Sequence, residues 1–440
     1  MRKIYYQMWK EIKPDTYLHY NAFSNQFLLL NAKKHNQFCN LACTDIEYEA
    51  PEFYKLLLDN QFIVSDDYNE QEITLYHKKN SQDNSSMYQV VINTTLDCNL
   101  NCWYCYENRV PGSILKEEVI EGIKKNIEFE YDRTPFNTLK MSFFGGEPFF
   151  NFNGIRKMLD FAKDFCEQKN LRLIADFTTN ATLITPKEID FLKDFECHFQ
   201  ITLDGDKEVH NSIKKVKDKS IDTYQKTIDA LRLIEEHISN RWIALRINFD
   251  NRILQKIDDI IADIDFLNRQ SSYVILKKVW QIPKDRVDTV LLHNAIQKLF
   301  DKNFLVDYYV MPKGCVCFAE RQRQVLFNYD GKVFKCSTIS SFDDTNILGE
   351  LDSKTGYIQW DMTKMAYWNK DLLSSKCKGC LWFPACLGPC NRQLLAHKGT
   401  HICTFDSINL TDEEYLVYLF KYNLLRNQLY SQPNTTNYEH

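Results

Sequence analysis

The stretch that decides the fold is TTLDCNLNCWYC, residues 94–105, in which three cysteines follow a run of β-forming residues. Cys98, Cys102 and Cys105 have the spacing C-x3-C-x2-C on a single loop. Three thiolates on one loop can hold three irons of a cubane 4Fe-4S cluster and leave the fourth iron without a protein ligand. A closed zinc site needs four ligands, and no fourth Cys or His is near in the sequence. The spacing therefore predicts a cluster whose open iron can bind a small molecule.

The cysteine loop follows the first of six predicted β-α units. Each strand is rich in β-branched or aromatic residues, and a helical stretch follows each one. This alternation is typical of a parallel α/β sheet with crossover helices, either doubly wound or a partial barrel. The predicted strands are Gln89–Asn93, Leu139–Phe144, Leu171–Thr178, His198–Leu203, Ile243–Phe249 and Tyr273–Val279. The predicted helices are Leu115–Glu130, Ile155–Glu167, Pro186–Phe195, Thr223–His237, Leu254–Phe266 and Arg286–Phe300.

A second motif lies at the end of the second predicted strand, where the sequence reads Gly145-Gly146-Glu147-Pro148. Two glycines let the backbone pass close to a ligand, and a carboxylate there can pair with an ammonium group. Alone, this sequence is more often a tight turn. One β-α unit after the cysteine loop, it predicts a binding site at the carboxyl ends of the strands, where barrels place catalytic groups.

With Tyr104 at the aromatic position of C-x3-C-x-aromatic-C, the chain resembles the radical S-adenosylmethionine (radical SAM) enzymes. The resemblance implies a partial (β/α)6 barrel of the TIM type. It also implies that the methionine part of S-adenosylmethionine chelates the open iron of a 4Fe-4S cluster. Gly145, Gly146, Glu147 and Pro148 would then hold its amino group, and Tyr104 would lie beside the adenine.

Two later strand ends also resemble motifs of that family. Asn180 follows the third strand, and Thr202 and Asp204 follow the fourth, so the resemblance implies that they contact the cofactor. His210 lies shortly after them, although Asp204 and His210 could equally be a local cap or a satisfied buried group. Where relatives often carry an Arg that binds the cofactor carboxylate, this chain has Lys214, followed by another lysine.

A second group of cysteines lies in residues 315–403 and contains eight of the chain's 15. Thiolates spaced by two or three residues bind metals, and eight divide simply into two sites with four ligands each. As zinc knuckles these sites would be structural, and as 4Fe-4S clusters they could carry electrons.

The spacing of this group resembles the SPASM extension of radical SAM enzymes. That resemblance implies two auxiliary 4Fe-4S clusters, one held by Cys315, Cys317, Cys336 and Cys390 and the other by Cys377, Cys380, Cys386 and Cys403. If only one of Cys315 and Cys317 binds, the first cluster keeps an open iron that could ligate a substrate thiolate.

Residues 1–88 read as a small α+β module. They contain strand-like runs at 17–20 and 26–30, a helical stretch at 45–60 and a polar stretch at 78–86 that predicts a linker. The module resembles the winged-helix-like element with which many peptide maturases bind the leader of a precursor peptide as an added strand. The alternative is a structural cap on the barrel.

Four other cysteines, Cys39, Cys43, Cys166 and Cys197, are predicted to be buried core thiols. Cys39 and Cys43 form a C-x3-C pair that could bind a metal, but no further ligand lies near them in the sequence.

Composition excludes several classes of protein. The chain has 440 residues, 44% of them hydrophobic, and 54 Lys and Arg against 59 Asp and Glu, which gives a net charge of −5. We therefore expect no nucleic-acid partner. No secretory signal and no membrane-spanning run is visible, so we expect a cytoplasmic protein without a membrane partner. We expect four parts: residues 1–88, the barrel at 89–304, the SPASM domain at 305–405, and 406–440 with a helix at Asp412–Tyr430 and a disordered tail.

The resemblance implies a peptide maturase with three 4Fe-4S clusters and S-adenosylmethionine. It would generate a 5′-deoxyadenosyl radical and install a thioether or carbon–carbon cross-link in a ribosomally made precursor peptide. Its partners would be that peptide and a reductase, flavodoxin or ferredoxin as electron donor. One alternative is an anaerobic sulfatase-maturing type that forms formylglycine, but Ser337 stands where such enzymes place an Asp. Another is a non-catalytic metal protein that binds a peptide.

Overall fold

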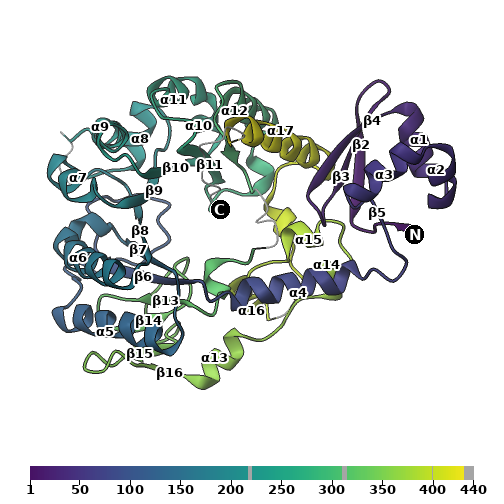
Figure 1. The fold of residues 1–440 in the computed structure, drawn as a ribbon. Helices are drawn as coiled ribbons and strands as arrows, with labels where there is room; N and C mark the ends of the chain where they lie inside the picture. Colours follow the sequence, from purple (N-terminus) through teal and green to yellow (C-terminus); the bar gives the residue numbers. More distant parts are fainter. Residues whose placement is uncertain (217–220, 310–314, 399, 431–440) are drawn as a thin grey trace.

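One 11-stranded sheet organises most of the molecule, with the strand order β12-β11-β10-β9-β8-β7-β6-β13-β14-β15-β16 (Figure 1). The structure, a computed structural model, describes residues 1–216, 221–309, 315–398 and 400–430. The tail that we predicted to be disordered, residues 431–440, lies outside the described residues.

The six predicted strands are confirmed as β6–β11, and each is parallel to its neighbours. Their carboxyl ends therefore meet at one edge of the sheet. They span Met87–Thr95, Thr138–Gly145, Arg172–Thr179, Glu196–Thr202, Arg241–Phe249 and Ser272–Lys278.

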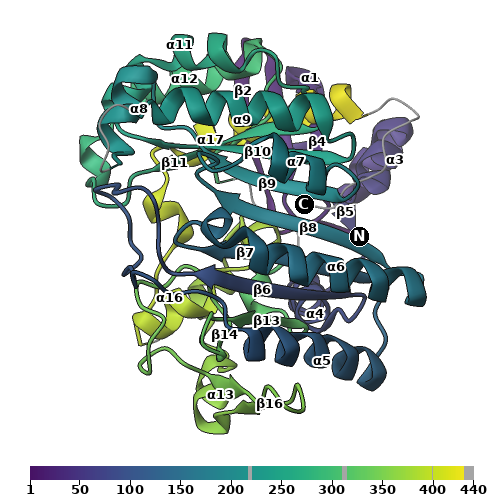
Figure 2. The same ribbon diagram turned by 90° about the vertical axis from the view of Figure 1, so that its left-hand side faces the viewer.

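The crossover helices lie along the outer side of this sheet (Figure 2). They are α5 (Glu117–Arg133), α6 (Phe152–Lys169), α7 (Pro186–Leu192), α8 (Lys207–Ile213), α9 (Thr223–His237), α10 (Asn251–Gln255), α11 (Ile257–Ile264) and α12 (Thr289–Asp301), with short 3-10 turns η1 (Pro148–Asn151) and η2 (Lys284–Arg286). The prediction of one continuous helix at 254–266 was wrong. Lys256 leaves the helical backbone conformation and separates α10 from α11. The predicted helix at 286–300 begins later, at Thr289, because Asp288 caps it by accepting from the backbone N–H groups of Val290 and Leu291.

Strands that were not predicted extend the sheet at both edges. β12 (Val306–Asp307) pairs in parallel with β11, and β13 (Gln324–Phe327) pairs in parallel with β6. The antiparallel strands β14 (Lys332–Phe334), β15 (Gly349–Leu351) and β16 (Ile358–Trp360) then follow. The cysteine-rich segment thus continues the sheet of the barrel, and the sheet stays open because β12 and β16 are its edges.

The N-terminal module contains a three-stranded antiparallel sheet, β2 (Gln7–Lys13), β3 (Thr16–Asn21) and β4 (Gln26–Asn31), next to the two-stranded pair β1 (Arg2–Lys3) and β5 (Ile63–Val64). Four helices accompany these strands: α1 (Ala32–Asn40), α2 (Cys43–Glu49), α3 (Pro51–Asp59) and α4 (Glu70–Asp83).

Two predictions for this module were wrong. The single helix at 45–60 is divided into α2 and α3, because Pro51 lacks an N–H and begins a new helix at its first position. The linker at 78–86 is mostly the second half of α4. The side chains of Lys79 and Asp83 face solvent, and the ion pair between them, 3.1 Å long, joins successive turns of that helix.

The module packs against the cysteine-rich part of the chain. The hydroxyls of Tyr5 and Tyr6 donate to the backbone carbonyls of Gly379 (2.9 Å) and Lys378 (2.8 Å). Tyr20 contacts the ring of Trp382 with 5.7 Å between centroids. The helices of the C-terminal part are α13 (Met362–Trp368), α14 (Ser375–Lys378), α15 (Phe383–Cys386), α16 (Asn391–Ala396) and α17 (Asp412–Tyr430), with η3 (Phe318–Glu320) and η4 (Thr404–Ser407).

A single hydrophobic core joins these parts. It includes Tyr6 and Tyr20 of the module, Phe177 of β8, Trp382, and Tyr415 of α17. Within the barrel, the rings of Phe143, Phe177 and Phe199 stack across β7, β8 and β9 at centroid distances of 5.4 and 5.1 Å. The parallel strands are therefore fixed relative to one another by side-chain packing as well as by backbone hydrogen bonds.

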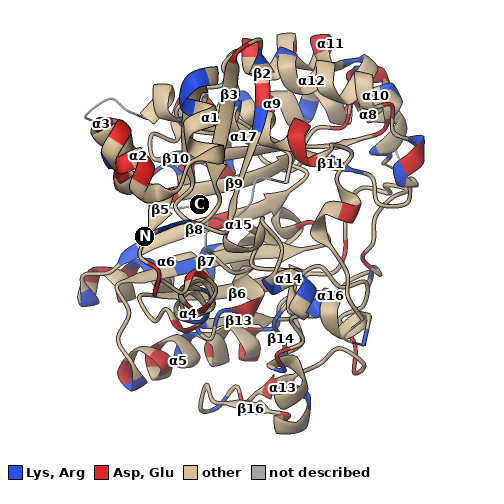
Figure 3. Ribbon diagram, turned by 90° about the vertical axis from the view of Figure 1, so that its right-hand side faces the viewer, with Lys and Arg blue, Asp and Glu red and all other residues tan. Residues whose placement is uncertain are grey.

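Lys and Arg residues and Asp and Glu residues are both spread over the helices of the N-terminal module and of the barrel (Figure 3). None of the helices in the described part of the chain is both long and apolar enough to cross a membrane.

Candidate active site

The cysteine loop and the Gly145-Gly146-Glu147 segment meet at the carboxyl ends of β6 and β7. The N–H of Gly146 donates to the carbonyl of Thr95 (3.0 Å), and the N–H of Glu147 donates to the carbonyl of Asp97 (2.9 Å). A Cβ on Gly145 would lie 2.0 Å from the Thr95 oxygen, and one on Gly146 would lie 2.1 Å from the Asp97 oxygen. The two glycines are therefore required by the close approach of this segment to the base of the cysteine loop.

Glu147 is fully buried, and its carboxylate joins the end of β7 to the end of β8. One carboxylate oxygen accepts from the Thr179 hydroxyl (2.6 Å) and the Phe149 N–H (3.1 Å), and the other accepts from the Asn180 N–H (2.8 Å). Burial raises the pKa of this carboxyl group, and the hydrogen bonds oppose the shift. A carboxylate can accept about four hydrogen bonds, so one acceptor position remains for a donor such as an ammonium group.

Asn180, at the end of β8, connects that strand to the cysteine loop. Its amide donates to the side-chain oxygen of Asn99 (3.1 Å) and lies 3.9 Å from the sulfur of Cys98. The amide of Asn99 in turn donates to the hydroxyl of Thr182 (2.9 Å). Asn99 was not predicted from the sequence, although its place between two loop cysteines is a signal that could have found it.

A second polar network joins the loop to β9 and β10. The hydroxyl of Tyr104 donates to a carboxylate oxygen of the fully buried Asp204. The other Asp204 oxygen accepts from the backbone N–H (3.0 Å) and side-chain amide (3.2 Å) of Asn248. Burial, together with the charge of Asp204, raises the pKa of Tyr104. Asn248 was missed by the sequence reasoning, and its position at the end of the fifth strand is the signal that could have found it.

Lys214 is buried, with its ammonium group inside this network. It donates to the hydroxyl of Thr202 and lies 3.5 Å from a carboxylate oxygen of Asp204. Its positive charge lowers the pKa of the Cys102 thiol, against the stronger effect of burial. The predicted residues Thr202, Asp204 and Lys214 are thus brought together beside the cysteine loop.

His210, on α8, has one ring nitrogen that accepts from the backbone N–H of Asp204 (3.2 Å). Its other ring nitrogen, Nε2, is buried without a hydrogen-bond partner among the described residues. Burial lowers the pKa of this histidine to about 3, so the ring is neutral and Nε2 carries the proton.

The three loop cysteines fit a cluster better than a single ion. Burial raises the pKa of Cys98 to about 12, with a contribution from the charge of Cys102, and Cys102 is similarly affected by Cys105. The three thiols share the loop 98–105, and their sulfurs are not among the ligand atoms that lie within 4.8 Å of one another in the described part of the chain. A donor set of three spread thiols suits the separate irons of a cubane.

The cysteines of the C-terminal part fall into two groups in space. The pKa of Cys317 is raised by burial and by the charges of Cys390 and Cys336. The pKa of Cys380 is raised by burial and by Cys403 and Cys377, and that of Cys386 by burial and by Cys403 and Cys380. The groups are thus Cys317, Cys336 and Cys390 on one side, and Cys377, Cys380, Cys386 and Cys403 on the other.

Cys315 lines a cavity of about 320 Å³ between the barrel and the cysteine-rich part. Cys317, Cys386 and Cys390 also line it, so the cavity touches both cysteine groups. On the barrel side its walls include Lys277, at the carboxyl end of β11, and further residues Asp307 and Tyr309.

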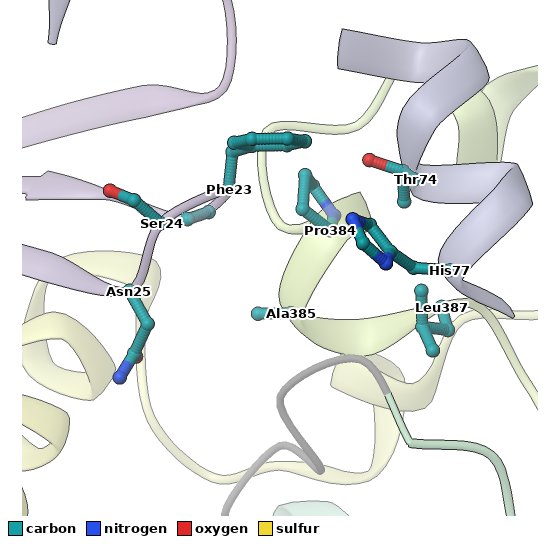
Figure 4. Close-up of a pocket in the computed structure, with 9 residues that line it drawn as sticks. Phe23, Ser24, Asn25, Thr74, His77, Pro384, Ala385 and Leu387 are labelled. Carbon is teal, nitrogen blue, oxygen red and sulfur yellow. The ribbon is translucent and has the colours of Figure 1, made fainter. Parts of the chain in front are cut away.

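A second cavity, of about 380 Å³, lies between the N-terminal module and α15. Figure 4 shows Phe23 and Asn25, from the turn between β3 and β4, on one side, and His77 of α4 and Leu387 on the other. The cavity ends directly beside the second cysteine group, because Ala385 and Leu387 flank Cys386.

Comparison with known proteins identifies the barrel. Residues 92–261 match the model of the Radical SAM superfamily. The chain is 24% identical over 346 residues to the cysteine-type anaerobic sulfatase-maturating enzyme of Clostridium novyi (strain NT), a match that covers 67% of this chain and 85% of that protein. It is 26% identical over 230 residues to the radical SAM cyclopropyl synthase TigE of Paramaledivibacter caminithermalis, which covers 48% of this chain and 45% of that protein.

A solved structure of native anSMEcpe with bound AdoMet and Cp18Cys peptide has the same fold. The TM-score is 0.55 at 20% sequence identity, and the match covers 78% of this chain and 99% of that one. Residues 92–261 therefore form a radical SAM domain, and this domain identifies the chain as an enzyme.

Proposed function

We propose that the chain is a radical SAM maturase with a SPASM-type C-terminal domain that cross-links a ribosomally made precursor peptide. The observation that carries the proposal is the cavity that two C-terminal cysteine groups share at the carboxyl end of the barrel. A peptide in this cavity would lie between those cysteines and Lys277 at the carboxyl end of β11. Its relatives support the substrate class, since the Clostridium novyi relative is named as a sulfatase-maturating enzyme and the anSMEcpe structure holds a peptide.

The loop cysteines Cys98, Cys102 and Cys105 would hold a 4Fe-4S cluster that leaves one iron open to S-adenosylmethionine. When bound, the cluster and the cofactor supply the one-electron chemistry that removes a hydrogen atom from an unactivated carbon. Glu147 would orient the cofactor's ammonium group with its remaining acceptor position. Lys214 would supply the positive charge for the carboxylate, in the place of the Arg that relatives often carry.

The other residues of the site would position the cofactor and the cysteine loop, and they would exclude water. Tyr104, held by Asp204 and Asn248, would present a ring edge to the adenine, and Asn180 would keep the base of the loop against β8. The burial of Glu147, Asp204 and Lys214 strengthens their electrostatic interactions by keeping water away.

The two C-terminal cysteine groups would hold auxiliary 4Fe-4S clusters that accept the surplus electron of the reaction. The first cluster would use Cys317, Cys336 and Cys390, with Cys315 as fourth ligand. Cys315 lines the 320 Å³ cavity. If Cys315 does not bind the first cluster, the iron without a protein ligand would therefore face the bound peptide.

The N-terminal module would bind the leader of the precursor peptide. Its sheet has two edge strands, β2 and β4, which offer unpaired backbone groups to an added strand. The 380 Å³ cavity between this module and α15 would guide the chain toward the cysteine groups.

A second candidate is the formation of formylglycine, which the similarity to sulfatase-maturating enzymes favours. Ser337, which follows Cys336, has no acidic group to act as general base. Mass spectrometry of a co-expressed precursor peptide separates the two: a cross-link removes two hydrogens and joins two residues, whereas formylglycine changes a single Cys or Ser.

The experiment that tests the proposal is anaerobic reconstitution, followed by assay with S-adenosylmethionine and dithionite. Replacement of Cys98, Cys102 and Cys105 by Ala should abolish the formation of 5′-deoxyadenosine, and Cys377→Ala should retain it but lose peptide modification. Cys166→Ala, which removes a buried thiol of α6, is the matched control and should keep both. Cofactor cleavage in the triple variant would contradict the assignment of the loop, and peptide modification by Cys377→Ala would contradict the auxiliary role.

A further inference from the structure

The N-terminal module brings three metal-ligating side chains together far from the barrel site. His19, His35 and Cys39 have ligand atoms that all lie within 4.8 Å of one another. Among the residues that the structure describes, they are the only three His, Cys, Asp or Glu side chains grouped in this way. Cys39 was predicted to be a buried core thiol, and that prediction was wrong because the residue is exposed.

Two elements place the three side chains. His35 and Cys39 are four residues apart on α1, so they lie on the same face of the helix. His19 lies on β3, opposite that face. Asn31 fixes the start of α1 directly after β4, since its side chain caps the helix by accepting from the Lys34 N–H (3.0 Å). The position of α1 against the sheet is therefore set by a short and hydrogen-bonded connection.

The distances between the ligand atoms are close to those around one ion. His19 Nε2 lies 2.9 Å from His35 Nδ1, and the sulfur of Cys39 lies 3.7 Å from that same nitrogen. Around a tetrahedral zinc, two ligand nitrogens are separated by about 3.3 Å, and a nitrogen and a sulfur by about 3.5 Å. The sulfur also lies 3.9 Å from His35 Nε2, so the imidazole of His35 must turn to direct Nδ1 toward an ion that it shares with Cys39.

The surroundings hold the imidazoles in place and leave a route for an ion. Tyr17 stacks on His35 with 3.8 Å between centroids and 6° between planes, and Trp9 contacts the same ring edge-on at 4.5 Å. His19 and His35 are 1% and 6% exposed, whereas Cys39 faces solvent. An ion can therefore reach the buried nitrogens from the side of the thiol.

Without a metal, the two histidines form a hydrogen bond in which one ring donates and the other accepts. That explanation accounts for the contact between His19 and His35, but it gives no role to Cys39, which joins the pair from the next turn of the helix. Two imidazoles and a thiolate are a donor set that zinc prefers, and a site with three protein ligands leaves a fourth position for water.

We propose that His19, His35 and Cys39 bind Zn²⁺ and thereby fasten α1 to β3 in the N-terminal module. This site is independent of the cysteine clusters and of the proposed peptide chemistry.

The test uses the full chain, purified anaerobically with its iron–sulfur clusters reconstituted, incubated with ZnSO₄ and desalted. Zinc and iron are then counted by plasma mass spectrometry. The wild type should retain a single equivalent of zinc that Cys39→Ala and His35→Ala lose, with iron unchanged. Cys43→Ala, which removes a buried thiol of the same module, is the matched control and should retain the zinc.

X-ray absorption at the zinc edge identifies the ligands, and it separates this site from zinc held by unfilled cluster cysteines. We expect a first shell of nitrogen with a single sulfur, and a shell of four sulfurs would overturn the proposal. Equal zinc content in the wild type and in Cys39→Ala would also overturn it. Because Cys39 is exposed, its replacement should leave the fold intact, which circular dichroism checks.

Discussion

Individual side chains of the barrel site are each held by several partners. Glu147 accepts three hydrogen bonds from two other segments, and Asp204 accepts from both Tyr104 and Asn248. The sequence predicted the two acidic residues because they stand directly after strands. It did not predict Asn248, which holds Asp204, because an Asn in a strand is as often solvated as structural, and only its place at the end of the fifth strand marks it.

Glu147→Gln should damage the site without a change in size. The amide group of Gln must face either the Phe149 N–H or the Asn180 N–H, so a buried backbone donor loses its acceptor. We expect a cost of about 1–3 kcal/mol in stability. We also expect a loss of cofactor binding, because the negative charge for the ammonium group is removed.

Equilibrium dialysis with S-adenosylmethionine measures the binding, and urea unfolding under anaerobic conditions measures the stability. Glu167→Gln, an exposed change on α6, serves as the control and should alter neither. Unchanged affinity of Glu147→Gln for S-adenosylmethionine would show that the carboxylate does not contact the cofactor.

The strand ends are the elements on which the site depends. All six parallel strands were predictable because each is rich in β-branched or aromatic residues and is followed by a helical stretch. The strands β12 and β13 were not, because each is short and the pairing of β13 with β6 joins residues more than 230 positions apart. α4 was missed for a different reason: a polar exposed helix has the composition of a linker, and only its capping and ion pairs distinguish it.

Gly146→Ala should separate the ends of β6 and β7. The new Cβ would lie 2.1 Å from the Asp97 oxygen and 2.6 Å from the carbonyl carbon, and both are backbone atoms that cannot rotate away. We expect a loss of about 2–3 kcal/mol in stability. We also expect poor assembly of the loop cluster, a deficit of about four irons per chain after reconstitution.

Iron analysis and thermal unfolding check this prediction. The control is Gly112→Ala, in the loop between β6 and α5 that carries the three cysteines. There φ is +73°, but no atom lies within 4 Å of the new Cβ. That variant should lose only about 1 kcal/mol of stability, and it should keep its full iron content. Full iron content in Gly146→Ala would mean that the loop can move away from β7 without harm.

At the scale of the whole molecule, the three parts of the chain share a core. Trp382, which is 3% exposed, contacts Tyr20 of the N-terminal module as well as Phe405 and Tyr415 of the C-terminal part. Contacts of this kind join residues from distant parts of the sequence. They could not be predicted from it, because no local pattern tells which apolar faces meet.

Trp382→Ala should therefore loosen two parts of the molecule together. We expect a destabilisation of about 3–5 kcal/mol, as for other buried aromatic residues. Hydrogen exchange should accelerate both in β3 and in α17. Trp280→Ala, at a position 68% exposed, should leave exchange in both elements unchanged. Faster exchange in α17 alone would show that the module folds separately.

The packing of Tyr5, Tyr6 and Tyr20 on α14, α15 and Trp382 has a practical consequence for engineering. A chimera that exchanges residues 1–88 for the corresponding part of a relative would place a foreign surface against these helices. Changing the leader specificity that we propose for this module would then require the matching faces of α15 and α17 to be transferred with it. Specificity in this scaffold is thus expected to evolve by paired changes at both ends of the chain, rather than by exchange of its first segment alone.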